Sequence, residues 1–202
     1  MGSNEDAVSR AAEVLRAGGL VVMPTDTVYG VAARADEPSA IDRLFKAKGR
    51  RPEKALPILV ASLVDAAVIA DLTPLARRLA ETFWPGPLTI VVPARAGFDS
   101  PALAGGRTIG LRMPDNHVAL GVIAAAGGRL AVSSANRSDG PNPLTVEEAR
   151  SQLGNSVSLY IDGGQAAGET GSTIVDCTGE APKILREGPI SAAEIAAAAA
   201  SA

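Results

Sequence analysis

The stretch Met23-Pro24-Thr25-Asp26-Thr27-Val28-Tyr29-Gly30-Val31 is the most informative part of this chain. It places a polar turn between two apolar runs, residues 19–23 and 28–33. Both runs have the length and content of buried strands. Polar side chains at a strand end are costly to bury without partners. The pattern therefore predicts two strands and, between them, a turn that faces a ligand or water.

A cationic cluster follows, centred on Lys48-Gly49-Arg50. The preceding residues 39–48 have helical spacing and end at Gly49, so Lys48 and Arg50 flank a predicted helix C-terminus, where the helix dipole favours cations. A local structural role and a role in binding phosphates are both open from the pattern alone. The cluster consists of Arg43, Lys46, Lys48, Arg50, Arg51 and Lys54.

The whole chain has the composition of an ordinary globular protein. It has 202 residues, 47% of them hydrophobic and 20% charged, with a net charge of −3. This length favours one domain, residues 1–202, with a core over about 7–190 and an Ala-rich helix over 191–202. The negative net charge argues against a chain built mainly to coat nucleic acid.

Helix and strand signals alternate along the chain, so we expect a mixed α/β fold with about seven to eight strands in a twisted parallel and antiparallel sheet flanked by helices. Thr145 with Glu148, and Ser191 with Glu194, are predicted to begin the last two helices. The predicted helices are 7–17, 39–48, 63–70, 74–83 and 118–126, and the predicted strands are 19–23, 28–33, 56–60, 88–92, 108–111, 130–132, 159–161, 173–175 and 184–185.

Several classes of protein are excluded or disfavoured. Cys177 and His117 are the only residues of their types, so neither an internal disulfide nor a structural zinc site of the usual kind is expected. The chain has no P-loop, G-x-G-x-x-G or H-E-x-x-H motif. His117 is expected at a helix start on the surface and Cys177 as a buried inert thiol. Without a membrane-spanning run or signal peptide, the expected location is the cytoplasm.

The candidate site residues share one placement. Most of them follow an apolar strand directly, which is where α/β sheets build binding sites, and Ser172 directly precedes one. Any one of them alone is more often a turn residue than a ligand-binding residue. Their number, and the arginines among them, favour a binding site. They are the turn from Thr25 to Tyr29, Arg112, Ser134, Asn136, Ser172 and Arg186.

These residues lie in motifs that resemble those of the YrdC-like threonylcarbamoyl-AMP synthases, over almost the whole chain. The chain is most similar to the short form of the family, without an extra C-terminal domain. The motifs are Pro24-Thr25-Asp26-Thr27-Val28-Tyr29-Gly30, Lys48-x-Arg50, Trp84-Pro85-Gly86-Pro87-Leu88-Thr89, Gly110-Leu111-Arg112-Met113-Pro114, Ser134-Ala135-Asn136, Ser172-Thr173-Ile174-Val175-Asp176 and Ile184-Leu185-Arg186-Glu187-Gly188.

Three positions depart from the family pattern. Arg51 separates Arg50 from Pro52, where the proline usually follows directly. The loop after Asn136 contains Asp139 as an insertion, at the expected lip of the cleft. Longer members often have a histidine near the position of Leu59, which this chain lacks.

The resemblance implies a reaction that joins L-threonine, bicarbonate or CO2, and ATP into threonylcarbamoyl-AMP and pyrophosphate, for threonylcarbamoyladenosine in tRNA. It implies a cationic concave cleft, Mg2+ bound through the ATP phosphates, a downstream threonylcarbamoyl transferase and a possible tRNA contact. Lys48 and Arg50 would be catalytic, and Thr25, Tyr29 and Arg50 would bind threonine. The nucleotide would be bound by Lys48, Arg112, Ser134, Asn136, Ser172 and Arg186.

Three alternatives remain at this point. An RNA- or tRNA-binding module of the same fold is disfavoured by the acidic charge and by an aromatic content of only 3%. A carbamoyl-adenylate enzyme like the hydrogenase-maturation relatives would need a much longer chain. A paralogue without synthase activity is disfavoured by the presence of both Lys48-x-Arg50 and Ser134-x-Asn136.

Overall fold

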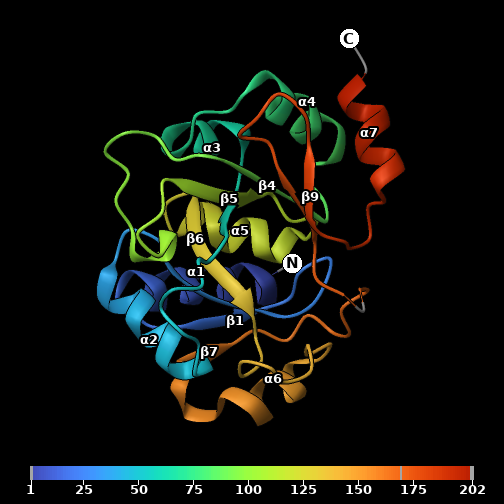
Figure 1. Ribbon diagram of the computed structural model, residues 1–202. Coiled ribbons are helices and arrows are strands. Elements are labelled where there is room, and N and C mark those ends of the chain that lie inside the picture. The colour runs from blue at the N-terminus through green and yellow to red at the C-terminus, as the bar shows by residue number, and fades with distance from the viewer. Residues whose placement is uncertain (1, 169, 201–202) are drawn as a thin grey trace.

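The computed structural model describes residues 2–168 and 170–200 and contains one mixed sheet (Figure 1). Among these residues nine strands follow the order β7-β1-β2-β6-β3-β5-β4-β8-β9. The mixed sheet is confirmed. Its nine described strands overlap all nine predicted ranges, against an expected total of about seven to eight. The strands are β1 (Val21–Met23), β2 (Gly30–Arg34), β3 (Ile58–Val60), β4 (Leu88–Pro93), β5 (Thr108–Arg112), β6 (Arg129–Ser134), β7 (Leu159–Tyr160), β8 (Thr173–Asp176) and β9 (Lys183–Arg186).

The helices follow the predicted capping signals. Thr145 and Glu148 form the expected reciprocal capping box, and the Ser191 hydroxyl donates to the Glu194 carboxylate. The first helix begins at Gly2, earlier than the predicted start at residue 7. The last helix was predicted over residues 191–202. It is described from Ala192 to Ala200, and residues 201–202 lie outside the described residues. The helices are α1 (Gly2–Arg16), α2 (Pro38–Lys48), α3 (Leu63–Ile69), α4 (Pro74–Phe83), α5 (His117–Ala125), α6 (Val146–Leu153) and α7 (Ala192–Ala200).

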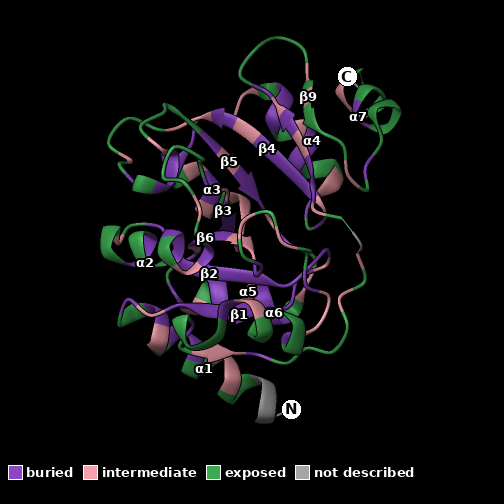
Figure 2. Ribbon diagram, turned by 60° about the horizontal axis from the view of Figure 1, so that its bottom comes forward, coloured by how far each residue is buried: buried purple, intermediate pink, exposed green. Residues whose placement is uncertain are grey.

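The sheet separates two apolar clusters, one on each face. The larger cluster joins the sheet to α2, α3, α4, α6 and α7. The smaller one joins α1 and α5 to strands β1, β2, β3 and β6, and none of its described members comes from β4, β5 or β8. Figure 1 shows α4 beside α7 at one end of the molecule and α6 at the other. Figure 2 shows the central strands buried and β9 exposed at the edge.

The site lies on the sheet face of the smaller cluster, over the strands that α1 and α5 do not cover. Side chains alternate along a strand, so Ile109 and Leu111 of β5 point into the larger cluster and Arg112 points to the opposite face. The same alternation on β4 buries Leu88 and Ile90 and leaves Thr89 on the face of Arg112. A cleft therefore forms where α1 and α5 no longer cover the sheet.

Within the described residues, no helix has both the length and the apolar content that crossing a membrane requires.

Candidate active site

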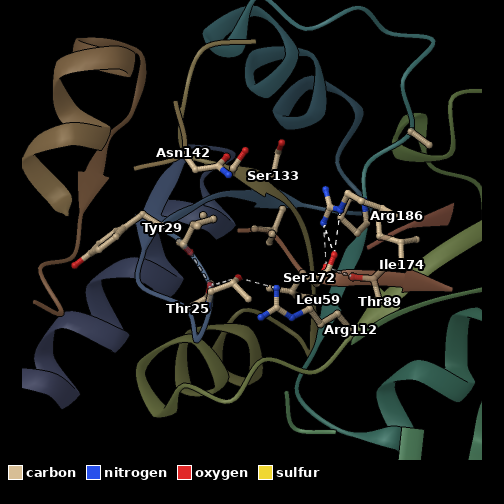
Figure 3. A pocket seen from close by; sticks show the side chains of 18 of the residues that line it. Thr25, Tyr29, Leu59, Thr89, Arg112, Ser133, Asn142, Ser172, Ile174 and Arg186 are labelled. Carbon is tan, nitrogen blue, oxygen red and sulfur yellow. Dashed lines mark hydrogen bonds between the residues drawn. The ribbon is translucent and has the colours of Figure 1, made fainter. Parts of the chain in front are cut away.

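The cleft lies across the exposed ends and the uncovered face of the sheet (Figure 3). Its volume is about 250 Å³. Seven of the nine residues predicted for the site contribute to its lining: Thr25, Tyr29, Arg50, Arg112, Ser134, Ser172 and Arg186. The full lining is Thr25, Thr27, Val28, Tyr29, Gly30, Arg50, Ala55, Pro57, Leu59, Thr89, Arg112, Val132, Ser133, Ser134, Asn142, Gly171, Ser172, Ile174 and Arg186.

The polar turn between β1 and β2 forms one wall, and its hydroxyls are bonded within the protein. The Thr25 hydroxyl donates to the Val28 carbonyl at 2.6 Å and accepts from the Thr27 backbone N–H at 3.2 Å. The Thr27 hydroxyl lies 3.1 Å from that of Thr25. Since the Thr25 proton goes to Val28, Thr27 donates to Thr25, which uses the full capacity of the Thr25 oxygen. Thr25 therefore offers a ligand its methyl group more readily than its hydroxyl.

Arg112 forms the floor and is fixed at all three guanidinium nitrogens. Its Nε donates to the Gly86 carbonyl at 3.0 Å, one Nη donates to the Thr27 hydroxyl at 3.0 Å, and the other donates to the Asp26 carboxylate at 2.5 Å. Burial lowers the pKa of Arg112, while the Asp26 charge acts in the opposite direction. Two of its five N–H groups remain for a ligand.

Arg186 forms the opposite wall, on the edge strand β9. Its Nε and one Nη donate to the Ser172 carbonyl at 3.1 and 2.7 Å. The Ser172 hydroxyl is also bonded to the Thr89 hydroxyl at 2.7 Å. Figure 3 shows these three side chains together on one side of the cleft. Unlike Arg112, Arg186 is exposed and has no carboxylate partner among the described residues.

Arg50 reaches the cleft from the end of α2. Gly49 ends the helix at φ 60°, a left-handed conformation that glycine adopts without strain. Arg50 then donates to the carbonyls of Lys54 at 3.1 Å and Ala55 at 2.8 Å. Partial burial lowers its pKa. The chain turn at Gly49 thus directs a cation with only neutral partners into the cleft.

Lys48 and Asn136 lie outside the lining, unlike the other predicted site residues. The Lys48 ammonium group is buried and donates to the carbonyls of Ser134 and Asn136. Burial, with the nearby Arg50 charge, lowers its pKa to about 8. The Asn136 amide donates to the carbonyls of Arg137 and Gly140 at 2.9 and 2.8 Å. In this geometry both residues hold the loop after β6 from behind, and direct contact with a nucleotide stays a prediction.

Tyr29 contributes to the lining, but its hydroxyl points away from the cleft (Figure 3). The hydroxyl donates to the Gly164 carbonyl at 2.6 Å and accepts from the Gly163 N–H at 3.0 Å. The same segment approaches the polar turn so closely that a Cβ on Gly168 would lie 2.6 Å from the Thr27 carbonyl oxygen. The Tyr29 hydroxyl therefore anchors the segment over residues 161–168, and it is not oriented toward a substrate hydroxyl.

Sequence reasoning named Asp26 and Thr27 only as part of the turn from Thr25 to Tyr29, and it did not single out Thr89, Ser133 or Asn142. Thr27 and Thr89 lie within recognised motifs, so their place in the lining was detectable. Asp26 became informative only with its partner Arg112, 86 positions away. Asn142 lines the cleft from the loop that contains Asp139, and no local pattern indicates this, because only the folded loop directs it inward.

Besides the arginines, the lining side chains with unused hydrogen-bonding capacity lie at the end of β6 and in the loop that follows it. Neither Ser133, Ser134 nor Asn142 uses its side chain in a hydrogen bond to another described residue, and Figure 3 shows Ser133 and Asn142 near each other. Cys177 and His117 do not line the cleft. Cys177 is buried as expected, and burial raises its pKa to about 12. The described residues contain no acidic, histidine or cysteine cluster suited to holding a metal ion.

A sheet that carries arginines and hydroxyls around one cleft defines a site for a small ligand with anionic groups. The chain belongs to the Sua5/YciO/YrdC family, whose family model, described as "Telomere recombination", matches residues 13–188. The family confirms the resemblance noted from the motifs.

Relatives cover the chain almost completely. One from Mycobacterium tuberculosis, provisionally assigned as a threonylcarbamoyl-AMP synthase, is 43% identical over 92% of this chain and 86% of that protein. The Bacillus subtilis threonylcarbamoyl-AMP synthase is 34% identical over 98% of this chain. The structure of Pyrococcus abyssi Sua5 complexed with L-threonine matches with a TM-score of 0.92 at 36% identity over 96% of this chain. The chain spans 58% of the Bacillus protein and 57% of the Pyrococcus chain.

Proposed function

We propose that this chain is an L-threonylcarbamoyl-AMP synthase. The observation that carries the proposal is the cleft itself, which Arg50 from the loop after α2, Arg112 from β5 and Arg186 from β9 all line. Planar guanidinium groups suit carboxylates and phosphates, and the proposed reactants carry both. The family relatives with the synthase name support this reading over an RNA-binding module.

The proposed chemistry needs no side-chain nucleophile. Bicarbonate takes up a proton and loses water to give CO2. The threonine amine then adds to CO2, forming a C–N bond and releasing a proton to give a carbamate. A carbamate oxygen then attacks the α-phosphorus of ATP, and the bond to the β-phosphate oxygen breaks to release pyrophosphate. The protein would contribute by holding the reactants together and by stabilising negative charge, roles that the three arginines suit. Cys177 and His117, outside the lining, take no part.

Mg2+ would be bound through ATP phosphates and water. No carboxylate is among the described residues that line the cleft, so the protein itself offers no acidic ligand there. This fits the tendency of Mg2+ to keep several waters and substrate oxygens as ligands. The ion would neutralise phosphate charge, with the arginines holding the remaining oxygens.

We further propose that ATP, bicarbonate and L-threonine are the substrates and that a separate transferase passes the threonylcarbamoyl group to tRNA in the cytoplasm. The Pyrococcus structure with L-threonine supports threonine as a ligand of the family. Selection against valine would need a hydrogen bond to the substrate hydroxyl. Ser133, Ser134 and Asn142 have side-chain capacity for it, whereas the hydroxyls of Thr25 and Tyr29 are used within the protein.

The test is pyrophosphate release from MgATP and bicarbonate with L-threonine, L-serine, L-valine or no amino acid. We expect release only when threonine and bicarbonate are both present, with valine close to the blank. Folded protein that binds ATP but shows no threonine-dependent release would contradict the proposal. Salt-sensitive tRNA binding in that protein would then favour the RNA-binding alternative.

A further inference from the structure

The ion pair between Asp26 and Arg112 connects distant parts of the sheet. Asp26 belongs to the polar turn after β1, and Arg112 is the last residue of β5, with β2, β6 and β3 between these strands in the sheet order. Their side chains are 13% and 7% exposed, the lowest values of any ion pair found among the described residues. A pair this buried is costly to desolvate, so its geometry needs a reason beyond stability.

Arg112 lines the cleft, whereas Asp26 does not. Asp26 therefore contacts the guanidinium from behind the surface that a ligand would touch. With Gly86 on Nε and Thr27 on one Nη, the carboxylate completes a set of three bonds that fixes the plane of the guanidinium. Fixing that plane determines where its two remaining N–H groups point.

The charges around the cleft give Asp26 a second role. Arg186 repels Arg112 and acts to lower its pKa, while Asp26 acts to raise it. Arg50 also lines the cleft, so three arginines face it, and no carboxylate is among the described lining residues. Asp26 is the carboxylate bonded to one of them. It therefore offsets part of the repulsion that would otherwise move the Arg112 side chain.

We propose that Asp26 is a positioning residue, which holds Arg112 in the orientation that binds the reacting carbamate or phosphate oxygens. This inference rests on the proposed function for its chemistry and on the geometry for its mechanism. Asp26 acts through Arg112 and does not touch the substrate. Removing its charge while keeping its shape would leave Arg112 in place as a cation but would loosen its orientation.

The substitution that tests this is Asp26→Asn, because asparagine keeps an acceptor oxygen and removes the charge. We expect kcat/KM for ATP in the threonine-dependent assay to fall by about 10-fold or more, as for other misplaced catalytic groups. Asp36→Asn is the matched control, since Asp36 bonds Arg34 at 2.6 Å on the surface and lies outside the cleft lining. It should keep wild-type kinetics. Unchanged kinetics in Asp26→Asn would overturn the proposal.

A double-substitution cycle separates positioning from a general structural role. In an Arg112→Lys background the Asp26→Asn change should reduce kcat/KM by less than about 2-fold, because interacting residues are not additive. An equal reduction in both backgrounds would overturn the proposal. If Asp26→Asn does not fold, as judged by thermal unfolding, Asp26→Ser, which leaves space for a water beside Arg112, replaces it in the same cycle.

Calorimetric titration with MgATP keeps this test independent of the proposed function. If wild-type protein lacks threonine-dependent turnover, the synthase proposal has failed. The same cycle measured on the dissociation constant for MgATP still decides whether Asp26 acts through Arg112. Weaker binding in Asp26→Asn that disappears in the Arg112→Lys background supports the inference, and equal binding in wild type and Asp26→Asn contradicts it.

Discussion

Arg112 and Arg186 face the same cleft from two regions that differ in almost every physical respect. Arg112 ends a central strand, is 6% exposed and has a carboxylate partner. Arg186 ends an edge strand, is exposed, and among the residues that the structure describes donates only to the carbonyl and hydroxyl of Ser172. The central region offers an arginine whose position is set before a ligand arrives. The edge region offers one that is held by the neutral groups of Ser172, with no acid among the described residues paired with its charge.

The comparison suggests how binding energy is divided. A prepositioned group loses little side-chain entropy when the ligand binds, which favours orientation of the reacting atoms. An exposed cation with only neutral partners keeps its full charge for phosphate groups. Arg50 resembles Arg186 in this respect, because its described partners are also backbone carbonyls.

The largest effect should come from Arg112→Ala. It removes the prepositioned cation and leaves Asp26 buried without its partner, so we expect kcat/KM to fall about 10²–10³-fold and the free energy of unfolding to fall by about 3–5 kcal/mol. Urea unfolding and pyrophosphate release measure the two effects. Arg95→Ala is the control, because its 3.3 Å pair with Asp71 is at the surface. If Arg112→Ala and Arg95→Ala have equal free energies of unfolding, the buried position of Arg112 does not distinguish it from a surface arginine.

Arg186→Ala and Arg50→Ala should reduce activity without unfolding the protein. Each removes a cation from the cleft, so we expect a loss in kcat/KM of about 10²-fold while the free energy of unfolding changes by about 1 kcal/mol or less. Arg51→Ala is a neighbouring control, since Arg51 is exposed and outside the lining. Near-normal turnover in Arg50→Ala would refute the role assigned to that residue.

Lys48 should give stability a dependence on alkaline pH. Its pKa in the folded protein is about 8, against an ordinary value of 10.5. Between these values the unfolded chain holds a proton that the folded protein has released, so stability rises with pH by up to about 3 kcal/mol. Below pH 8 the cost of burying the charge is fully present. Urea midpoints at pH 7, 8.5 and 10 should rise more steeply for wild type than for Lys48→Met, and equal slopes would contradict this.

Tyr29→Phe should have the smallest effect. The ring stays buried, but the Gly163 N–H and the Gly164 carbonyl lose their hydroxyl partner, so we expect a loss of about 1–2 kcal/mol in stability. Selection of threonine over valine should remain unchanged, because the hydroxyl points away from the cleft. Chemical unfolding and the ratio of kcat/KM values for the two amino acids measure this. A large loss of selectivity would restore the reading of Tyr29 as the partner of the substrate hydroxyl.

Local patterns predicted the elements well. Continuous apolar runs identified the strands, and caps at Thr145 and Ser191 identified the starts of the last two helices, because these signals depend on neighbours in the chain. The edge strands and helix ends shifted by a few residues, since pairing and packing decide where a strand or helix stops. The ordered motifs also indicated the family.

The sequence by itself determined the mixed α/β sheet, the buried inert Cys177 and seven of the residues that line the cleft, because residues at strand ends are placed by the alternation of the chain. Only the tertiary structure decided what each side chain does there. It directed Lys48 and the Tyr29 hydroxyl away from the cleft, brought Asn142 into it and paired Asp26 with Arg112. Those outcomes depend on contacts between residues far apart in the chain, which burial and hydrogen bonding select only once the sheet has formed.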